Sequence, residues 1–399
     1  MKNNIFIYFK WLSSYLIVLC SMFLVVACET TPSQQSGTGQ AKSLPQSPQP
    51  PPAQAENVSE IPTQPGDLWE RIRLNLSWQT VENTRVDKAR EALLRQNNYL
   101  PMIADRADYY LFYIVEEVQK RGMPMEIVLI PMVESTLDPF AASYSGAAGL
   151  WQIMPGTGKH MGLEQNSWYD GRQALRDSTE GALDHLQSMY EKFDEDWLLA
   201  LAAYNAGGAN ISRAQRRNRE KGLGTDYWSL NLPRQAYDYV PKIIALSQIV
   251  VDPAHFDVEI PPVDNAPSFE IADTGVPLHF AQAAQLAGVD VATLRALNPE
   301  HVRGSLSPHR STDLLLPVGT RDRFEANVAQ LSSEQRAQQL LATSEAATAT
   351  GYQVRAGDSL YRIADRFKVS ISNIIAWNAL DPDEYLHPGQ KLTLYVTGR

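Results

Sequence analysis

The chain has 399 residues, 44% of them hydrophobic and 20% charged, which suits two or three globular domains joined by linkers. Its formal net charge of −10 argues against a nucleic-acid partner, because such partners are bound by basic surfaces. The short basic run Arg213–Arg219 is interpreted as a solvated helix face.

Residues 1–27 are typical of a signal peptide, because two lysines precede an uncharged apolar run over 11–27. The run ends in Val-Val-Ala-Cys, which resembles the lipobox of bacterial lipoproteins and implies cleavage before Cys28 and its lipidation. An uncleaved signal anchor is the alternative, since such a run just suffices to span a bilayer. The only other cysteine, Cys20, lies in this run, so the mature chain should hold no disulfide.

Residues 29–66 are rich in Pro, Gln, Ser and Thr and contain few large apolar side chains. Such a segment cannot bury enough surface to fold, so residues 28–66 are predicted to form a lipidated N-terminus and a disordered tether. Glu29 follows the lipidation position, where retention in the inner membrane usually requires Asp. We therefore expect an outer-membrane lipoprotein that faces the periplasm and meets the membrane through its N-terminal lipid.

From residue 67 to residue 252 apolar residues recur at spacings of three and four, the period of an amphipathic helix. Helices are predicted over 86–94, 102–118, 179–193, 197–206, 211–221 and 236–251. No strand-like alternation interrupts them. The sequence therefore predicts an all-helical domain over 67–252, with a motif core at 122–245, that is large enough for its own hydrophobic core.

After Pro253 the pattern changes to short strands and paired helices. Residues 351–396 are predicted to form a strand, two helices and a strand, and they resemble a LysM module, a small βααβ fold that binds glycan. The resemblance implies glycan-binding roles for the residues of two turns and one helix end: Gly357, Asp358, Ser359, Leu360, Asn378, Pro388 and Gly389.

Residues 267–318 look like a degenerate copy of this LysM-like pattern, with strands near 269–271 and 314–317. The copy lacks the Gly-Asp-Ser turn of 357–359, so a structural spacer is the alternative to a second glycan-binding module. Residues 319–350 are polar and rich in alanine, and they are predicted to form a linker.

Four motifs lie in the helical domain. Glu134 ends an apolar run, and it is followed by Gly-Leu-Trp-Gln-Ile-Met-Pro at 149–155, Ala-Tyr-Asn-Ala-Gly at 203–207 and Tyr-Val-Pro-Lys at 239–242. Together they resemble the lytic transglycosylase family of peptidoglycan enzymes. The resemblance implies a multidomain α+β chain, in which an all-helical lysozyme-like catalytic domain is followed by small βααβ LysM modules.

Glu134 is the candidate catalytic acid, because a carboxyl among apolar neighbours keeps its proton near neutral pH. Pairing with an arginine or a helix end is the structural alternative. Pro131 removes one helical hydrogen bond, so a bend is expected just before Glu134. Most glycoside hydrolases use two carboxylates, but the nearest second candidate, Asp138, precedes Pro139 and is predicted to lie in a turn.

The family resemblance implies cleavage of the β-1,4 bond between N-acetylmuramic acid and N-acetylglucosamine. Glu134 first protonates the oxygen that leaves C1, and then takes the proton of the C6 hydroxyl, which gives a 1,6-anhydro product without water. The resemblance also implies substrate-binding roles, with packing as the alternative for each, for Ser143, Gln152, Met154, Tyr204, Asn205 and Tyr239.

No metal or cofactor is expected, because the seven histidines show no ligand spacing and no phosphate-binding loop is present. The expected partner is the glycan strand of peptidoglycan, and the expected state is a monomer. Two alternatives stay open at this point. One is a goose-type-like muramidase that hydrolyses the same bond with water, and the other is a non-catalytic lipoprotein that only binds peptidoglycan.

Overall fold

The computed structural model describes residues 66–96, 98–275, 278–306, 313–332, 335, 349–355, 357–367, 371–378, 380 and 386–395. The predicted signal peptide, Cys28 and the tether up to residue 65 lie outside these residues. In the part of the chain that is described, no helix combines the length and the apolar character needed to cross a bilayer.

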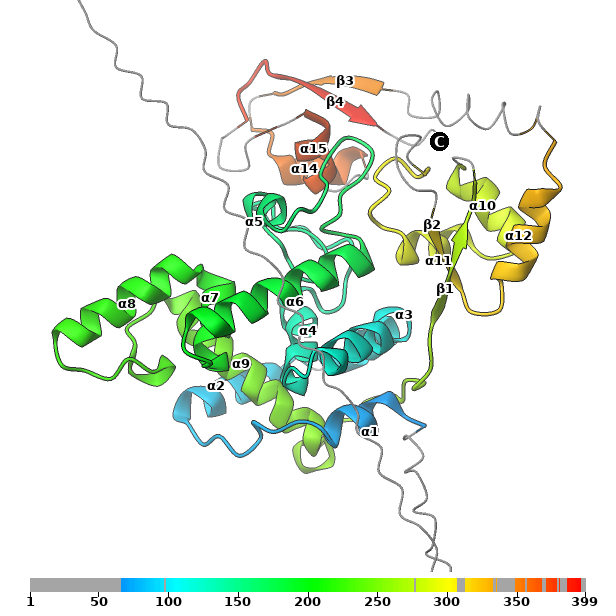
Figure 1. The fold of residues 1–399 in the computed structure, drawn as a ribbon. Helices are drawn as coiled ribbons and strands as arrows, with labels where there is room; N and C mark the ends of the chain where they lie inside the picture. The colour runs from blue at the N-terminus through cyan, green and yellow to red at the C-terminus, as the bar shows by residue number, and fades with distance from the viewer. Residues whose placement is uncertain are drawn as a thin grey trace, which may run out of the picture. The chain divides into compact units, whose positions relative to one another are not determined.

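The first part of the described chain is helical (Figure 1). Its elements are α1 (Leu68–Arg73), α2 (Thr84–Leu94), α3 (Tyr99–Lys120), the 3-10 helix η1 (Met125–Leu129), α4 (Ile130–Ser135), α5 (Pro155–His160), α6 (Leu175–Lys192), α7 (Trp197–Ala206), α8 (Gly208–Glu220), η2 (Tyr227–Ser229), α9 (Arg234–Val251) and η3 (Ala254–Phe256). Only isolated β-bridges occur among the described residues before β1, so the prediction of an all-helical domain is confirmed.

The helices begin where the sequence offers side-chain caps. Asp67, Asn83 and Asp196 each accept hydrogen bonds from backbone N–H groups in the first turn of α1, α2 and α7. Helix α9 lies against α2 and α7, and most of its residues are buried. This packing places the fourth motif, which is part of α9, inside the same hydrophobic core as the run that leads to Glu134.

Pro131 does not bend a helix, as the sequence suggested, but helps to start one. It occupies the first turn of α4, where its missing N–H leaves no hydrogen bond unmade. The apolar residues before it form the separate 3-10 helix η1. The expected bend is therefore a junction between two short elements, and Glu134 lies in the last turn of the second.

Two small βααβ units follow, as predicted. In the first, β1 (Phe269–Asp273) pairs antiparallel with β2 (Asp313–Pro317), and α10 (Phe280–Ala287) and α11 (Val291–Leu297) lie between them in sequence. In the second, β3 (Ala349–Gln353) pairs antiparallel with β4 (Lys391–Tyr395), with α14 (Leu360–Phe367) and α15 (Ile371–Asn378) between them. Each unit has a hydrophobic cluster of its own.

The two units share one side-chain device. The Asn298 amide donates to the carbonyl one turn earlier at 2.8 Å, and it exchanges two hydrogen bonds of 2.8 Å with the backbone of Leu315 in β2. The Asn378 amide likewise donates one turn back at 2.8 Å, donates to the Thr393 carbonyl at 2.9 Å and accepts from the Thr393 N–H at 2.6 Å. This equivalence supports the interpretation of the first unit as a copy of the second.

The predicted linker begins with a helix that belongs to the first unit. Helix α12 (Arg321–Ala329) buries Phe324 and Val328 in the same cluster as Leu314 and Leu316 of β2. The packing of this unit thus continues past residue 318, where the sequence pattern of the repeat ended.

Candidate active site

Glu134 is half-buried near the end of α4. Burial raises the pKa of its carboxyl, while the Tyr239 hydroxyl and the positive charge of Lys242 lower it. Within the described residues no ion pair holds this carboxyl. The geometry is that of an acid that can keep a proton and is still reachable, which does not fit the structural alternative of pairing with an arginine.

Three tyrosines lie within electrostatic reach of Glu134: burial raises the pKa of each, and the charge of Glu134 raises it further. Tyr204 donates a hydrogen bond to the carbonyl of Trp151 at 2.8 Å, and Tyr99 donates to that of Met132 at 2.9 Å. The buried Tyr239 hydroxyl interacts with the Glu134 carboxyl itself and lowers its pKa, against the effect of burial. Tyr204 and Tyr239 were predicted, whereas Tyr99 stands in no motif and had no local signal.

The second motif lies in a tight loop over 141–154, held by the isolated bridges Ala142↔Ala148 and Ala148↔Ile153. Gly149 has a φ of 79°, and a Cβ there would lie 2.1 Å from the Arg172 carbonyl oxygen, so only glycine fits. The absence of a side chain at this position therefore lets two backbone segments of the protein approach each other.

Two hydrogen bonds join this loop to the helices around it, one to α4, which carries the acid, and one to α7. Ser135, the residue after Glu134, donates to the Leu150 carbonyl at 2.9 Å, and Tyr204 donates to the next carbonyl, that of Trp151. The Trp151 side chain is buried and donates to the Thr179 hydroxyl at 3.0 Å, so it packs in the core. The loop that carries the predicted substrate-binding residues is thereby fixed relative to the acid.

The predicted binding residues of the loop are partly used by the loop itself. Ser143 Oγ accepts a hydrogen bond from the Ala147 N–H at 2.9 Å. Gln152, at a φ of 47°, donates from its amide to the Ala141 and Gly149 carbonyls. Met154 is half-buried immediately before α5. In contrast, the buried side-chain oxygen of Asn205 on α7 has no hydrogen-bond partner in the part of the chain that the structure describes.

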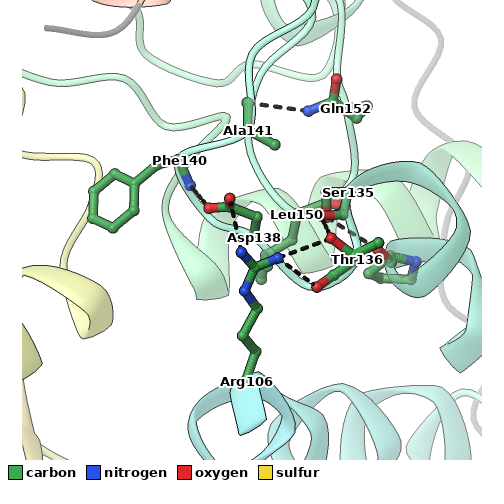
Figure 2. A network of polar contacts seen from close by, with 9 residues as sticks. Arg106, Ser135, Thr136, Asp138, Phe140, Ala141, Leu150 and Gln152 are labelled. Carbon is green, nitrogen blue, oxygen red and sulfur yellow. Dashed lines mark hydrogen bonds and ion pairs between the residues drawn. The ribbon is translucent and has the colours of Figure 1, made fainter. Parts of the chain in front are cut away.

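Figure 2 shows how Asp138, the only nearby second carboxylate in sequence, is occupied. The Arg106 guanidinium lies 3.3 Å from Asp138 Oδ2 and donates to the Thr136 carbonyl and hydroxyl at 2.9 and 2.8 Å. Asp138 also accepts from the Phe140 N–H at 2.9 Å, as expected in a turn. Thr136 and Leu137 both have a φ of 55°, a left-handed conformation that non-glycine residues rarely adopt.

The predicted LysM residues also have roles within their own fold. Asp358 accepts hydrogen bonds from the Tyr352 hydroxyl at 2.5 Å and the Arg355 N–H at 2.8 Å, and Ser359 Oγ accepts from the Arg362 N–H at 3.2 Å. Leu360 is buried, Gly357 and Gly389 have positive φ, and Pro388 precedes Gly389 in the turn before β4. The Asn378 amide is occupied as described above, a role that the sequence prediction did not include.

Comparison with known families assigns the helical domain to the lytic transglycosylases. Residues 112–225 match the Transglycosylase SLT domain, residues 352–394 the LysM domain, and residues 271–333 the LysM-like domain of lytic transglycosylase MltD. The chain is 38% identical to "Membrane-bound lytic murein transglycosylase D" of Escherichia coli (strain K12) over 331 residues, which are 82% of this chain and 73% of the relative. The chain belongs to the family of membrane-bound lytic murein transglycosylase D.

Other relatives match a smaller share of the chain. A "Membrane-bound lytic murein transglycosylase F" of Aeromonas salmonicida (strain A449) is 35% identical over 109 residues, 26% of this chain and 21% of its own. A solved inactive mutant of lytic transglycosylase Slt from Pseudomonas aeruginosa matches 38% of this chain and 26% of its own, with 20% identity and a TM-score of 0.28. The protein is thus a lytic murein transglycosylase with LysM modules that bind peptidoglycan.

Proposed function

We propose that the enzyme cleaves the β-1,4 bond between N-acetylmuramic acid and N-acetylglucosamine and forms 1,6-anhydro-N-acetylmuramic acid, with Glu134 as the single general acid and base. The observation that carries this proposal is that one half-buried carboxyl with a raised pKa is available, while Asp138 is paired with Arg106. A single carboxyl suits a reaction in which the substrate supplies its own nucleophile.

The reaction has two proton transfers at one oxygen of Glu134. The protonated carboxyl donates to the glycosidic oxygen, the C1–O bond breaks, and the acetamido group of the same sugar stabilises the positive charge at C1. The carboxylate then takes the proton of the C6 hydroxyl while the oxygen of that hydroxyl bonds to C1. The proton returns to Glu134 and no water is consumed. The raised pKa keeps the first step available near neutral pH.

We assign substrate contacts to the polar atoms that the fold leaves available. Among the described residues the buried side-chain oxygen of Asn205 has no hydrogen-bond partner, which favours a sugar group as its partner. The Tyr239 hydroxyl interacts with the Glu134 carboxyl, so it positions the acid beside the substrate. Because the Gln152 nitrogen is used by the loop, its oxygen is the atom that accepts from the substrate. Ser143 can still donate its hydroxyl proton, and Met154 contributes an apolar surface.

The test is the digestion of purified murein sacculi, followed by mass analysis of the released products. We expect anhydro ends with the wild type and a loss of at least about 100-fold in rate with Glu134→Gln, since general acid–base catalysis contributes about 10²–10⁴-fold. Reducing ends instead would support the muramidase alternative. Undiminished digestion by Glu134→Gln would exclude Glu134 as the acid.

We also propose that Cys28 is lipidated and that the monomeric enzyme acts from the outer membrane into the periplasm. The lipobox-like sequence supports this, and the E. coli relative is described as membrane-bound. Metabolic labelling with a fatty acid should mark the wild type and leave Cys28→Ala unlabelled. Label in the variant, or none in the wild type, would contradict the anchor.

A further inference from the structure

A cavity of about 670 Å³ lies between α2 and α9. Its lining includes the cationic side chains of Arg85, Lys88, Arg234 and Lys242, against one acidic side chain, Asp238. The formal charge of the lining is therefore positive, in a chain whose formal net charge is −10. Such a local reversal of sign favours an anionic ligand.

The four cationic side chains are not equally available to an anionic ligand. Arg85 donates to the Tyr227 hydroxyl at 2.6 Å and lies over the ring of Tyr237, so its place is fixed by the fold. Arg234 lies 3.7 Å from Asp238, but its side chain is 96% exposed, and an ion pair so exposed is weak. Lys88 is exposed and, within the described residues, has no ion pair.

Lys242 connects this cavity with the active site. It lines the cavity and follows Tyr239 by three residues on α9, a spacing that places both on one face of the helix. Its charge lowers the pKa of Glu134, so the carboxyl and the ammonium group interact. A ligand group in the cavity would therefore be close to the sugar ring that is cut at Glu134.

That ring carries an anionic substituent of the required kind. On the proposed function, the bond broken is at C1 of N-acetylmuramic acid, whose lactyl group bears a short peptide with free carboxylates. We infer that the cavity between α2 and α9 binds carboxylate groups of this peptide, with Lys88 and Arg234 as the contacts at its open side. The inference rests on the proposed function and adds to it a preference for glycan that carries peptides.

The experiment compares one glycan in two forms: purified strands with their peptides, and the same strands after an amidase has removed them. The measured quantity is kcat/KM on the strands with peptides divided by kcat/KM on the strands without them. In Lys88→Ala/Arg234→Ala we expect this ratio to fall about 3- to 10-fold, mainly through KM, because two exposed charge pairs are lost. The fall should shrink as salt is raised.

The matched control is Arg217→Ala/Lys221→Ala, which removes the same charge from exposed residues at the end of α8. It should leave the ratio at the wild-type value. An unchanged ratio in the cavity variant, or an equal fall in the control, would overturn the inference. If the wild type released no anhydro ends from either form, the proposed reaction itself would be contradicted, which is a separate result.

Discussion

Arg106→Ala tests how the site holds its acid. The guanidinium hydrogen-bonds the carbonyl and hydroxyl of Thr136 and pairs with Asp138, immediately after α4 ends (Figure 2). The pair is about one-third exposed, 31% and 33%, so these contacts together should contribute roughly 2 kcal/mol, between a buried charged hydrogen bond and a surface pair. The left-handed conformations of Thr136 and Leu137 each destabilise the fold by about 1–2 kcal/mol. The contacts of Arg106 therefore offset a strain of similar size.

Without the guanidinium this corner can relax, and Glu134 moves with it. A displacement of about 1 Å lowers a rate by about 100-fold, so we expect kcat to fall about 10- to 100-fold with little change in KM. Arg106→Lys, which keeps the charge but not the planar fork, should give an intermediate value. Arg121→Ala, at the other end of α3, removes an ion pair with Glu117 and serves as control.

The assay is steady-state kinetics on soluble murein strands, with chemical denaturation of each variant alongside. Wild-type kcat in Arg106→Ala would refute the reasoning. So would a loss of kcat of the same size in Arg121→Ala.

Three further predictions concern pH and stability. Because burial raises the pKa of Glu134 above its ordinary value of 4.5, the wild type loses stability as pH rises from about that value through the raised pKa, whereas Glu134→Gln does not. Calorimetry should give Glu134→Gln a higher melting temperature than the wild type at pH 8 and the same melting temperature at pH 4. A lower melting temperature of the variant at pH 8 would contradict this prediction. Tyr239→Phe removes a hydroxyl that lowers this pKa, so the alkaline limb of the kcat profile should move to higher pH, not lower. Asn298→Ala leaves the backbone N–H and carbonyl of Leu315 without their side-chain partner. Urea unfolding should show that the free energy of unfolding falls by about 2–4 kcal/mol, and a fall of less than about 0.5 kcal/mol would contradict the role of Asn298.

Local patterns were sufficient for several of the helices and strands. The helix predicted over 197–206 coincides with α7, and the strand predicted near 314–317 agrees with β2. Hydrophobic period, caps and turn residues act over a few neighbours, so a single sequence displays them directly. The position of Glu134 after an apolar run is a signal of the same local kind.

Contacts between distant segments could not be predicted in this way. Arg106 reaches Thr136 across 30 residues, and Ser135 reaches Leu150 across 15. Neither pair shows a periodic or compositional sign, because side-chain reach across packed helices depends on the tertiary arrangement. The internal role of Asn378 was missed for the same reason, since its partner Thr393 lies on a strand formed later in the chain.

The most direct test of the central claim is digestion of murein in water enriched in ¹⁸O. If Glu134 returns its proton while the C6 oxygen closes on C1, the released anhydro sugars contain no ¹⁸O. One ¹⁸O atom per cleaved bond, at C1, would show that water attacks and would contradict a mechanism with a single carboxyl and an internal nucleophile.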